Sequence, residues 1–182
     1  MNFINTSLEG VFIIEPRVFT DARGYFFESY NKAAFENAGL FYDFVQDNQS
    51  MSSYGTVRGL HFQKGEHSQA KLGRVLEGVV LDVAVDIRRT SPTYGRHVTV
   101  ELSGENKLMM LIPRGFAHGF SVLSETAVFA YKCDNFYCKE AEGGIRFDDP
   151  TLAIDWRIDM AKALTSEKDR QHPFFSEFES CF

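Results

Sequence analysis

The chain has 182 residues, a formal net charge of −6, 44% hydrophobic residues and 24% charged residues. This length fits one domain that buries a sizeable core, and the composition is ordinary for a soluble globular protein. The acidic balance argues against a nucleic-acid duplex or an anionic membrane as a partner, whereas a few converging cations could still bind a small phosphate-bearing ligand.

The cysteines and the N-terminus indicate where the protein works. Cys133, Cys138 and Cys181 are an odd number without CxxC spacing, which indicates reduced thiols rather than a disulfide framework. The opening MNFINTSLEG has no basic region followed by an apolar run. No stretch approaches the roughly 20 apolar residues that span a bilayer. These features predict a cytoplasmic protein.

The first forty residues predict a strand and one short helix. Residues 8–19 are expected to form an edge strand, because Pro16 cannot donate a hydrogen bond to a central ladder. Asn31 is a suitable N-cap for a helix over residues 32–38, and Gly39 stands where a left-handed helix stop belongs.

The middle of the chain alternates apolar and polar side chains with the period of a strand. After a mixed polar and aromatic segment at 41–54, alternating runs cover 79–86, 97–102, 107–112 and 126–132. Such short runs, separated by turn residues, favour an antiparallel sandwich or barrel. The segments SPTYG and IPRGFAHGF between them are expected to be loop-rich connections. An aromatic content of 14% also favours a β-rich body.

The last part of the chain loses this periodicity. GGIRFDDPTLAIDW is irregular, and residues 159–170 are polar and compatible with a helix. No internal repeat or linker divides the chain. We therefore expect residues 1–182 to form a single domain, with 150–182 as an irregular and partly helical appendage to it.

The stretch VRGLHFQKGEHSQAKLGR carries more titratable groups than a core hairpin and more apolar ones than a solvent loop. Such a conflict is expected where a sequence serves chemistry as well as folding. We interpret His61 as a candidate base and Lys71 as its electrophilic partner, although each alone also suits a core histidine or a surface lysine. Strand alternation would put Arg58 and His61 on opposite faces, so Gly59 is predicted to break it as a bulge.

Three residues outside this stretch are also candidates for the reaction centre, and two of them have a structural explanation as well. Tyr131 shares a strand face with apolar neighbours, and a buried tyrosine usually needs a partner for its hydroxyl. Asp169 stands three residues after Ser166, as in a capping box, but could also orient His61 as in a catalytic triad. His118 lies in a glycine-containing segment beside another expected strand.

The segment PRGFAH resembles the second motif of the cupin superfamily, in which a glycine turn presents a metal-binding histidine. The first cupin motif needs a His-x-His pair, but Gln63 stands two residues after His61. A three-histidine metal site is therefore not expected, although two histidines and a carboxylate could still hold a metal.

Cations and aromatic residues elsewhere suit a nucleoside diphosphate. Arg23, Arg58 and Lys168 could bind the diphosphate, because planar guanidinium groups match phosphate geometry. Phe26 and Tyr137 could stack on a nucleobase. Arg23 alone also suits an exposed turn.

Taken together, these motifs closely resemble the dTDP-4-dehydrorhamnose 3,5-epimerase family, the RmlC-type sugar epimerases of the cupin superfamily. The matching segments cover nearly the whole chain in order: FTDARGYFFES, QDNQS, VRGLHFQ, QAKL, VVLDVAVDIR, SPTYG, IPRGFAHGFSVLS, YKCDNFY, EGGIRFDDP and SEKD. The combination of RGLHFQ, RGFAHGF and YK…Y is highly specific. Val57 and Gly73 stand where bulkier aliphatic residues are common in the family, but neither matches a catalytic position.

The resemblance implies a cupin-type antiparallel jelly-roll with a few short peripheral helices, working without metal or cofactor. It implies a homodimer in which a segment of one subunit completes the site of the other. His61 would be the base, Asp169 its dyad partner, Lys71 the enolate stabiliser and Tyr131 the proton donor. The positions that would contact the dTDP-sugar are Arg23, Phe26, Glu28, Gln46, Asp47, Asn48, Arg58, Lys71, His118, Tyr137, Glu142 and Lys168.

The implied reaction is epimerisation at C3 and C5 of dTDP-4-dehydro-6-deoxy-D-glucose through an enolate, as in dTDP-L-rhamnose biosynthesis for cell-surface polysaccharide. Three alternatives stay open. The protein could epimerise only C3 or only C5, it could be a catalytically silent nucleotide-sugar binder, or it could be a metal-dependent cupin oxygenase. A silent binder would need no acid–base set such as His61, Lys71 and Tyr131.

Overall fold

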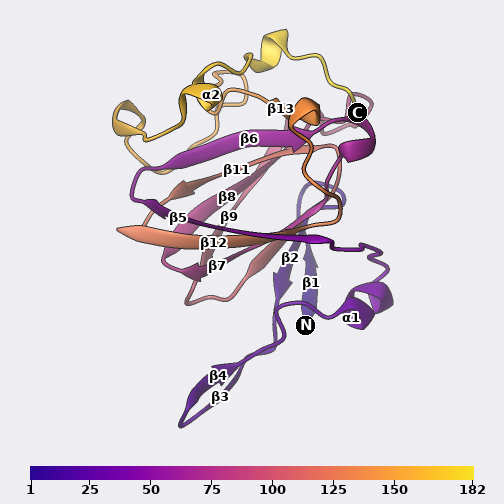
Figure 1. Ribbon diagram of the computed structural model, residues 1–182, viewed down its shortest axis with the longest axis vertical. Helices are drawn as coiled ribbons and strands as arrows, with labels where there is room; N and C mark the ends of the chain where they lie inside the picture. Colours follow the sequence, from indigo (N-terminus) through magenta and orange to yellow (C-terminus); the bar gives the residue numbers. More distant parts are fainter.

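Two antiparallel β-sheets face each other in the computed structural model, which describes all 182 residues (Figure 1). The six-stranded sheet has the order β1 (Asn2–Asn5), β2 (Phe12–Glu15), β10 (Met109–Ile112), β7 (Lys71–Glu77), β12 (Thr126–Cys133) and β5 (Gln46–Ser53). The five-stranded sheet has the order β13 (Glu142–Gly144), β6 (Val57–Gln63), β11 (Phe116–Val122), β8 (Val79–Asp86) and β9 (His97–Ser103). This is the jelly-roll that was expected.

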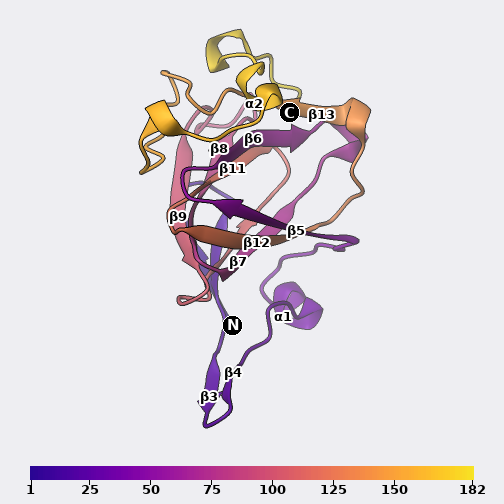
Figure 2. The same cartoon turned by 60° about the vertical axis from the view of Figure 1, so that its left-hand side comes forward.

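The remaining elements are short and peripheral. They are the hairpin of β3 (Phe19–Asp21) and β4 (Gly24–Phe26), helices α1 (Lys32–Asn37) and α2 (Glu167–Arg170), and 3-10 turns at Gly65–His67, Lys139–Ala141, Met160–Lys162 and Phe175–Glu177. Both views show the β3–β4 hairpin projecting away from the sheets (Figures 1 and 2). None of the helices has the length and apolarity needed to cross a membrane.

Apolar side chains from the two sheets meet in the main core, where the Phe120 and Phe129 rings stack with centroids 4.5 Å apart. A second core lies on the outer face of the five-stranded sheet, under the C-terminal segment. Trp156 anchors that segment, because its buried indole N–H donates to the Phe147 carbonyl at 2.7 Å. The C-terminal segment therefore covers the outer face of the five-stranded sheet.

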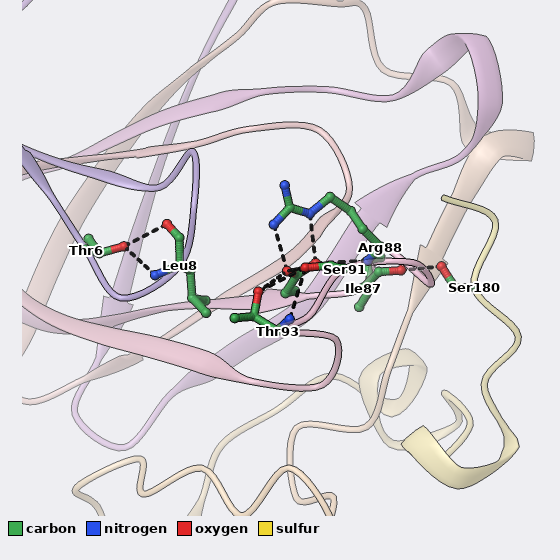
Figure 3. Close-up of polar contacts among 8 residues, drawn as sticks. Thr6, Leu8, Ile87, Arg88, Ser91, Thr93 and Ser180 are labelled. Atoms are coloured by element: carbon green, nitrogen blue, oxygen red, sulfur yellow. Dashed lines mark hydrogen bonds and ion pairs between the residues drawn. The ribbon is translucent and has the colours of Figure 1, made fainter.

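A group of hydrogen bonds lies at the end of β8 and includes one contact to the C-terminal segment (Figure 3). The fully buried Asp86 carboxylate accepts hydrogen bonds from Arg88, Ser91 and Thr93. Burial alone would raise the pKa of Asp86, but these donors lower it to about 2. The Ser180 hydroxyl donates to the carbonyl of Ile87, which ties the terminus to the same corner.

The local features of the first forty residues agree with the prediction for α1. The Asn31 side chain accepts a hydrogen bond from the Ala34 N–H at 3.2 Å, and Gly39 has φ of +79°. The expected edge strand is wrong, because β2 lies between β1 and β10 and β1 forms the edge. Pro16 follows β2, so its missing N–H does not affect the ladder.

Two other expectations need correction. The segment 41–54 contains an eight-residue edge strand, β5, which the polar sequence did not reveal. IPRGFAHGF is mainly strand, because β11 begins at Phe116 and every one of its residues is buried. Gly115 does lie in the turn before β11, but Gly119 lies inside this strand, which has sheet neighbours on both sides and cores on both faces.

Candidate active site

A cleft of about 680 Å³ opens at one end of the sandwich, between the two sheets and the segment that leads into α2. Its walls come from β5, β6, β7, β11, β12 and the first residue of β13, and from residues between 164 and 169. The predicted residues whose charged, titratable or amide side chains line it are Asn48, Arg58, His61, Lys71, His118, Tyr131, Glu142, Lys168 and Asp169. Nine of the residues predicted from the sequence therefore meet in one cavity.

His61 and Asp169 form a hydrogen-bonded dyad, with 2.8 Å between Nε2 of the imidazole and Oδ1 of the carboxylate. The other oxygen of Asp169 accepts the Gly59 N–H at 3.3 Å. Burial alone would raise the pKa of Asp169, but its hydrogen bonds with His61 and the Gly59 N–H keep it below the ordinary value. The carboxylate is therefore ionised and fixes the orientation of the imidazole.

The helix cap predicted at Ser166 is also present, and it positions the dyad. The Ser166 hydroxyl accepts the backbone N–H of Asp169 at 3.1 Å, which places Asp169 in the first turn of α2. The two interpretations of Asp169 are therefore compatible, because its backbone serves the cap and its side chain serves His61.

The predicted break of alternation at Gly59 is confirmed. Between β6 and β11, His61 pairs with His118 and Arg58 pairs with Phe120, so three steps along β6 match two along β11. Gly59 has φ of +140°, and a Cβ at this position would lie 2.5 Å from the Gly119 Cα. Only glycine fits this close approach, and the bulge brings Arg58 and His61 to the same cleft.

Lys71 and Tyr131 face the cleft from neighbouring strands β7 and β12. The Lys71 Nζ lies 5.9 Å from the centroid of the Tyr131 ring. Burial lowers the pKa of Lys71, against the opposing effect of nearby acidic groups such as Asp82. Burial raises the pKa of Tyr131, against the opposing effect of the Arg58 charge. The phenol is therefore protonated at neutral pH.

His118 is buried in the cleft wall and bonds to a carboxylate that sequence reasoning did not select. Its Nε2 lies 2.7 Å from Oδ1 of Asp82, which is fully buried. Burial lowers the pKa of His118, while Asp82 acts in the opposite direction. The signal that could have found Asp82 is its position inside the apolar run VVLDVAVD, where an unpaired acid would be costly.

Glu142 joins two other predicted residues at the mouth of the cleft. Its Oε2 accepts hydrogen bonds from the Tyr137 hydroxyl at 2.8 Å and from the Lys168 ammonium. Burial alone would raise the pKa of Glu142, but Lys168 and Tyr137 lower it. Gln46 reaches this group from β5, since its side chain bonds Asn48 at 3.0 Å and accepts the Tyr137 N–H at 3.0 Å.

Six predicted substrate contacts do not line the cleft of their own chain: Gln46 and Tyr137 bond at its mouth, and the other four lie farther away. Asp47 pairs with Lys132 at 2.7 Å on the exposed side of β5. Arg23 pairs with Asp21 at the tip of the β3–β4 hairpin, where its side chain is 90% exposed. Phe26 on the same hairpin is 66% exposed, and Glu28 accepts a hydrogen bond from the cap residue of α1.

His172 is a neighbour of the dyad that sequence reasoning missed. Its ring meets that of His61 edge to face, with centroids 5.8 Å apart and an interplanar angle of 72°. Its Nε2 is buried without a hydrogen-bond partner. Burial, together with the charge of His61, lowers the pKa of His172. The residue follows α2 in an irregular segment, where no periodicity or motif pointed to it.

Comparisons with known proteins agree on one family. The family model described as dTDP-4-dehydrorhamnose 3,5-epimerase matches residues 5–177. A protein of that name from Pseudomonas aeruginosa is 52% identical over 183 residues, covering 100% of this chain and 99% of the relative. The crystal structure of a dTDP-4-dehydrorhamnose 3,5-epimerase from Elizabethkingia anophelis superposes with a TM-score of 0.93 at 59% identity, covering 97% of each chain.

A second crystal structure carries a bound sugar nucleotide. It is a dTDP-6-deoxy-D-glucose-3,5-epimerase from Legionella pneumophila in complex with dTDP-4-keto-L-rhamnose. It superposes with a TM-score of 0.94 at 48% identity and covers 98% of this chain and 94% of its own. The similarity therefore extends over the whole jelly-roll and the elements that line the cleft.

Proposed function

This chain belongs to the dTDP-4-dehydrorhamnose 3,5-epimerase family, and on that premise we propose that it converts dTDP-4-dehydro-6-deoxy-D-glucose to dTDP-4-dehydro-L-rhamnose. It is an isomerase that inverts C3 and C5 of a nucleotide-linked sugar. The observation that carries the proposed mechanism is the shared cleft, which is lined by the Asp169-bonded imidazole of His61, the Tyr131 phenol and the Lys71 side chain.

His61 is the proposed base. A ketone at C4 acidifies the hydrogens on C3 and C5, so a general base of suitable pKa can remove one and leave an enolate. Asp169 accepts a hydrogen bond from the Nε2–H of His61, which keeps the proton on Nε2 and leaves the lone pair on Nδ1. As the imidazole takes the proton from carbon, the neighbouring carboxylate stabilises the positive charge.

Lys71 is the proposed partner of the enolate. Its ammonium places a positive charge in a desolvated part of the cleft. A preorganised charge or donor at a developing oxyanion contributes roughly 3–4 kcal/mol in other enzymes. His118, whose orientation Asp82 fixes, lines the same wall and is proposed to contact the sugar.

Tyr131 is the proposed acid. Inversion requires that the new proton arrive on the face opposite to the base, so a second group has to supply it. The raised pKa of Tyr131 keeps the phenol protonated until the enolate forms. After one inversion His61 holds an extra proton and Tyr131 lacks one, and exchange with solvent returns both to their starting states.

The nucleotide supplies binding energy away from the reacting carbons. Arg58 and Lys168 are the proposed cations for the diphosphate within the cleft, with Glu142 and Tyr137 at its mouth. Asn48, which lines the cleft, and Gln46, which bonds to Tyr137, are proposed to contact the same region, with Asp47 between them on the exposed side of β5. Three further predicted contacts lie outside the cleft of their own chain, namely Arg23, Phe26 and Glu28. We propose that they complete the nucleotide-binding region of the partner subunit.

We propose that the chain acts as one domain within a homodimer, where the β3–β4 hairpin reaches the cleft of the partner subunit. Support comes from the hairpin itself, which projects from the sheets and exposes Phe19, Tyr25 and Phe26. Exposed aromatic residues grouped in this way are typical of a protein interface. A cytoplasmic location is also proposed, in keeping with three free cysteines.

Solvent deuterium incorporation tests the proposed function. The purified protein, incubated with the substrate in deuterium oxide, is expected to introduce deuterium at both C3 and C5, measured by NMR of the product. Exchange at one carbon only would establish a single-site epimerase. No exchange at either carbon would refute the epimerase activity.

A further inference from the structure

Three potential metal ligands converge behind the base, and one of them has no part in the proposed reaction. His61, Asp169 and His172 each offer one ligand atom, and these atoms lie within 4.8 Å of one another. Two imidazoles and a carboxylate are a donor set that binds Zn²⁺ and similar divalent cations. The group comes from two separate parts of the chain, β6 and the segment around α2.

The third ligand, His172, packs closely against the strand next to His61. The Nε2 of His172 is buried and has no hydrogen-bond partner, whereas buried polar atoms normally have one. Position 144 is glycine, and a Cβ there would clash with the His172 ring at Nε2. Gly144 pairs directly with His61 across β13 and β6. The His172 ring, with its unpaired nitrogen, therefore packs beside the dyad.

We propose that His61, Asp169 and His172 form an inhibitory site for Zn²⁺. Zinc binds nitrogen and oxygen at about 2.0–2.2 Å, so tetrahedral ligands lie about 3.4 Å apart. The His61–Asp169 separation of 2.8 Å is slightly shorter than this, and the limit of 4.8 Å for the set is longer. Rotation of side chains closes the difference. The Gly59 N–H bonded to Asp169 supplies the outer contact that orients a ligating carboxylate.

The mode of inhibition follows from the two nitrogens of the imidazole. Zinc on Nε2 of His61 takes the place of the proton that Asp169 accepts. The remaining proton of the neutral ring then resides on Nδ1, which no longer has a lone pair to accept a proton from carbon. The inhibition rests on the proposed role of His61 as base, whereas the binding does not.

Calorimetric titration of the full chain with zinc chloride, in a buffer that does not bind metals, tests the site. We expect one ion per chain, and an affinity at least about 10-fold weaker in His172→Gln. His67→Gln is the matched control and should bind as the unchanged protein, because His67 lies outside the cleft beside Glu66. Equal affinity in His172→Gln would show an adventitious ion only and overturn the site.

Cobalt(II) distinguishes this site from the free thiols. Cobalt bound by imidazole and carboxylate should give visible absorption without the near-ultraviolet band of a sulfur ligand. A sulfur band would place the ion at Cys138 or Cys181, the two cysteines that are not buried, and would overturn the assignment.

The deuterium-exchange assay with and without zinc tests the inhibition. Zinc should slow exchange in the wild-type protein and in His67→Gln. At the same zinc concentration, the factor by which exchange slows should be at least about 10-fold smaller in His172→Gln. Zinc that binds through His172 without slowing exchange would overturn the inhibition. Absence of deuterium exchange in the metal-free protein would refute the proposed function, but it would not affect the zinc-binding result.

Discussion

The sugar-facing part of the cleft and the β3–β4 hairpin are both assigned to substrate, yet they are held in place by different contacts. His61, Lys71, His118 and Tyr131 stand on strands inside the two sheets, and the histidines among them have buried carboxylate partners. On the hairpin, Arg23 has only Asp21 as a partner and is almost fully exposed. Proton transfer needs geometry fixed within the chain, whereas binding energy can come from a projecting segment.

The largest expected effect is at the base. His61→Ala should lower the rate of deuterium exchange at both carbons by roughly 10³-fold, within the range for a general base. The affinity for dTDP should change little, because the nucleotide end keeps its contacts. Exchange rates by NMR and dTDP binding by calorimetry separate the two. Turnover equal to that of the unchanged protein would remove His61 as the base.

Tyr131→Phe should have a smaller effect and a different signature. It removes the proposed acid but leaves His61 and Asp169 in place. Abstraction should continue and return a solvent proton to the same face, while inversion should slow by roughly 10²-fold. The measurement is the ratio of deuterium exchange to product formation. A variant that loses both equally would contradict a role confined to reprotonation.

Two glycines provide a matched test of how rigidly each region is built. Gly59 on β6 and Gly24 on the hairpin both have positive φ, at +140° and +127°. A Cβ at 59 would meet the Gly119 backbone at 2.5 Å, whereas one at 24 meets nothing within 4 Å. Gly59→Ala should lower the free energy of unfolding by at least about 3 kcal/mol, and Gly24→Ala by about 1 kcal/mol.

Denaturant unfolding measures both values. Similar losses in the two variants would mean that strain of the backbone, and not the close approach of β6 to β11, dominates at Gly59. In that case the bulge would not be the rigid feature that sets the directions of Arg58 and His61.

Sequence reasoning succeeded where a local conflict or a short-range motif carried the information. The cap at Asn31 depends on residues three positions apart. The bulge at Gly59 was predicted because regular alternation would put Arg58 and His61 on opposite faces of the strand, whereas the proposed site needs both in one pocket. The cap at Ser166 likewise placed Asp169 in the first turn of α2.

It failed where tertiary context decides the structure. β5 is a polar strand at a sheet edge, so it lacks the apolar face that reveals a strand. β11 is buried on both faces, so it lacks the alternation of apolar and polar residues that reveals a half-buried strand. The dyad joins residues 108 positions apart, which no local pattern predicts. His172 was missed because only its packing against Gly144 brings it to His61.

The smallest expected effect is at the hairpin. Arg23→Ala should raise KM about 10-fold with little change in kcat, because an exposed cation contributes binding and takes no part in proton transfer. Phe26→Ala should act in the same direction through lost stacking. A large fall in kcat would contradict the division between the two regions.

Mixing two impaired chains then tests whether the hairpin serves the partner subunit. In a mixed dimer of His61→Ala and the double variant Arg23→Ala/Phe26→Ala, one cleft has an intact base together with an intact hairpin from the other chain. Since half of the dimers are mixed at equal proportions, about a quarter of the sites should regain normal activity at low substrate concentration. If each hairpin instead served its own chain, mixing would give only the average of the two variants. The rise above that average, measured after unfolding and refolding the chains together, therefore distinguishes a shared site from a self-contained one.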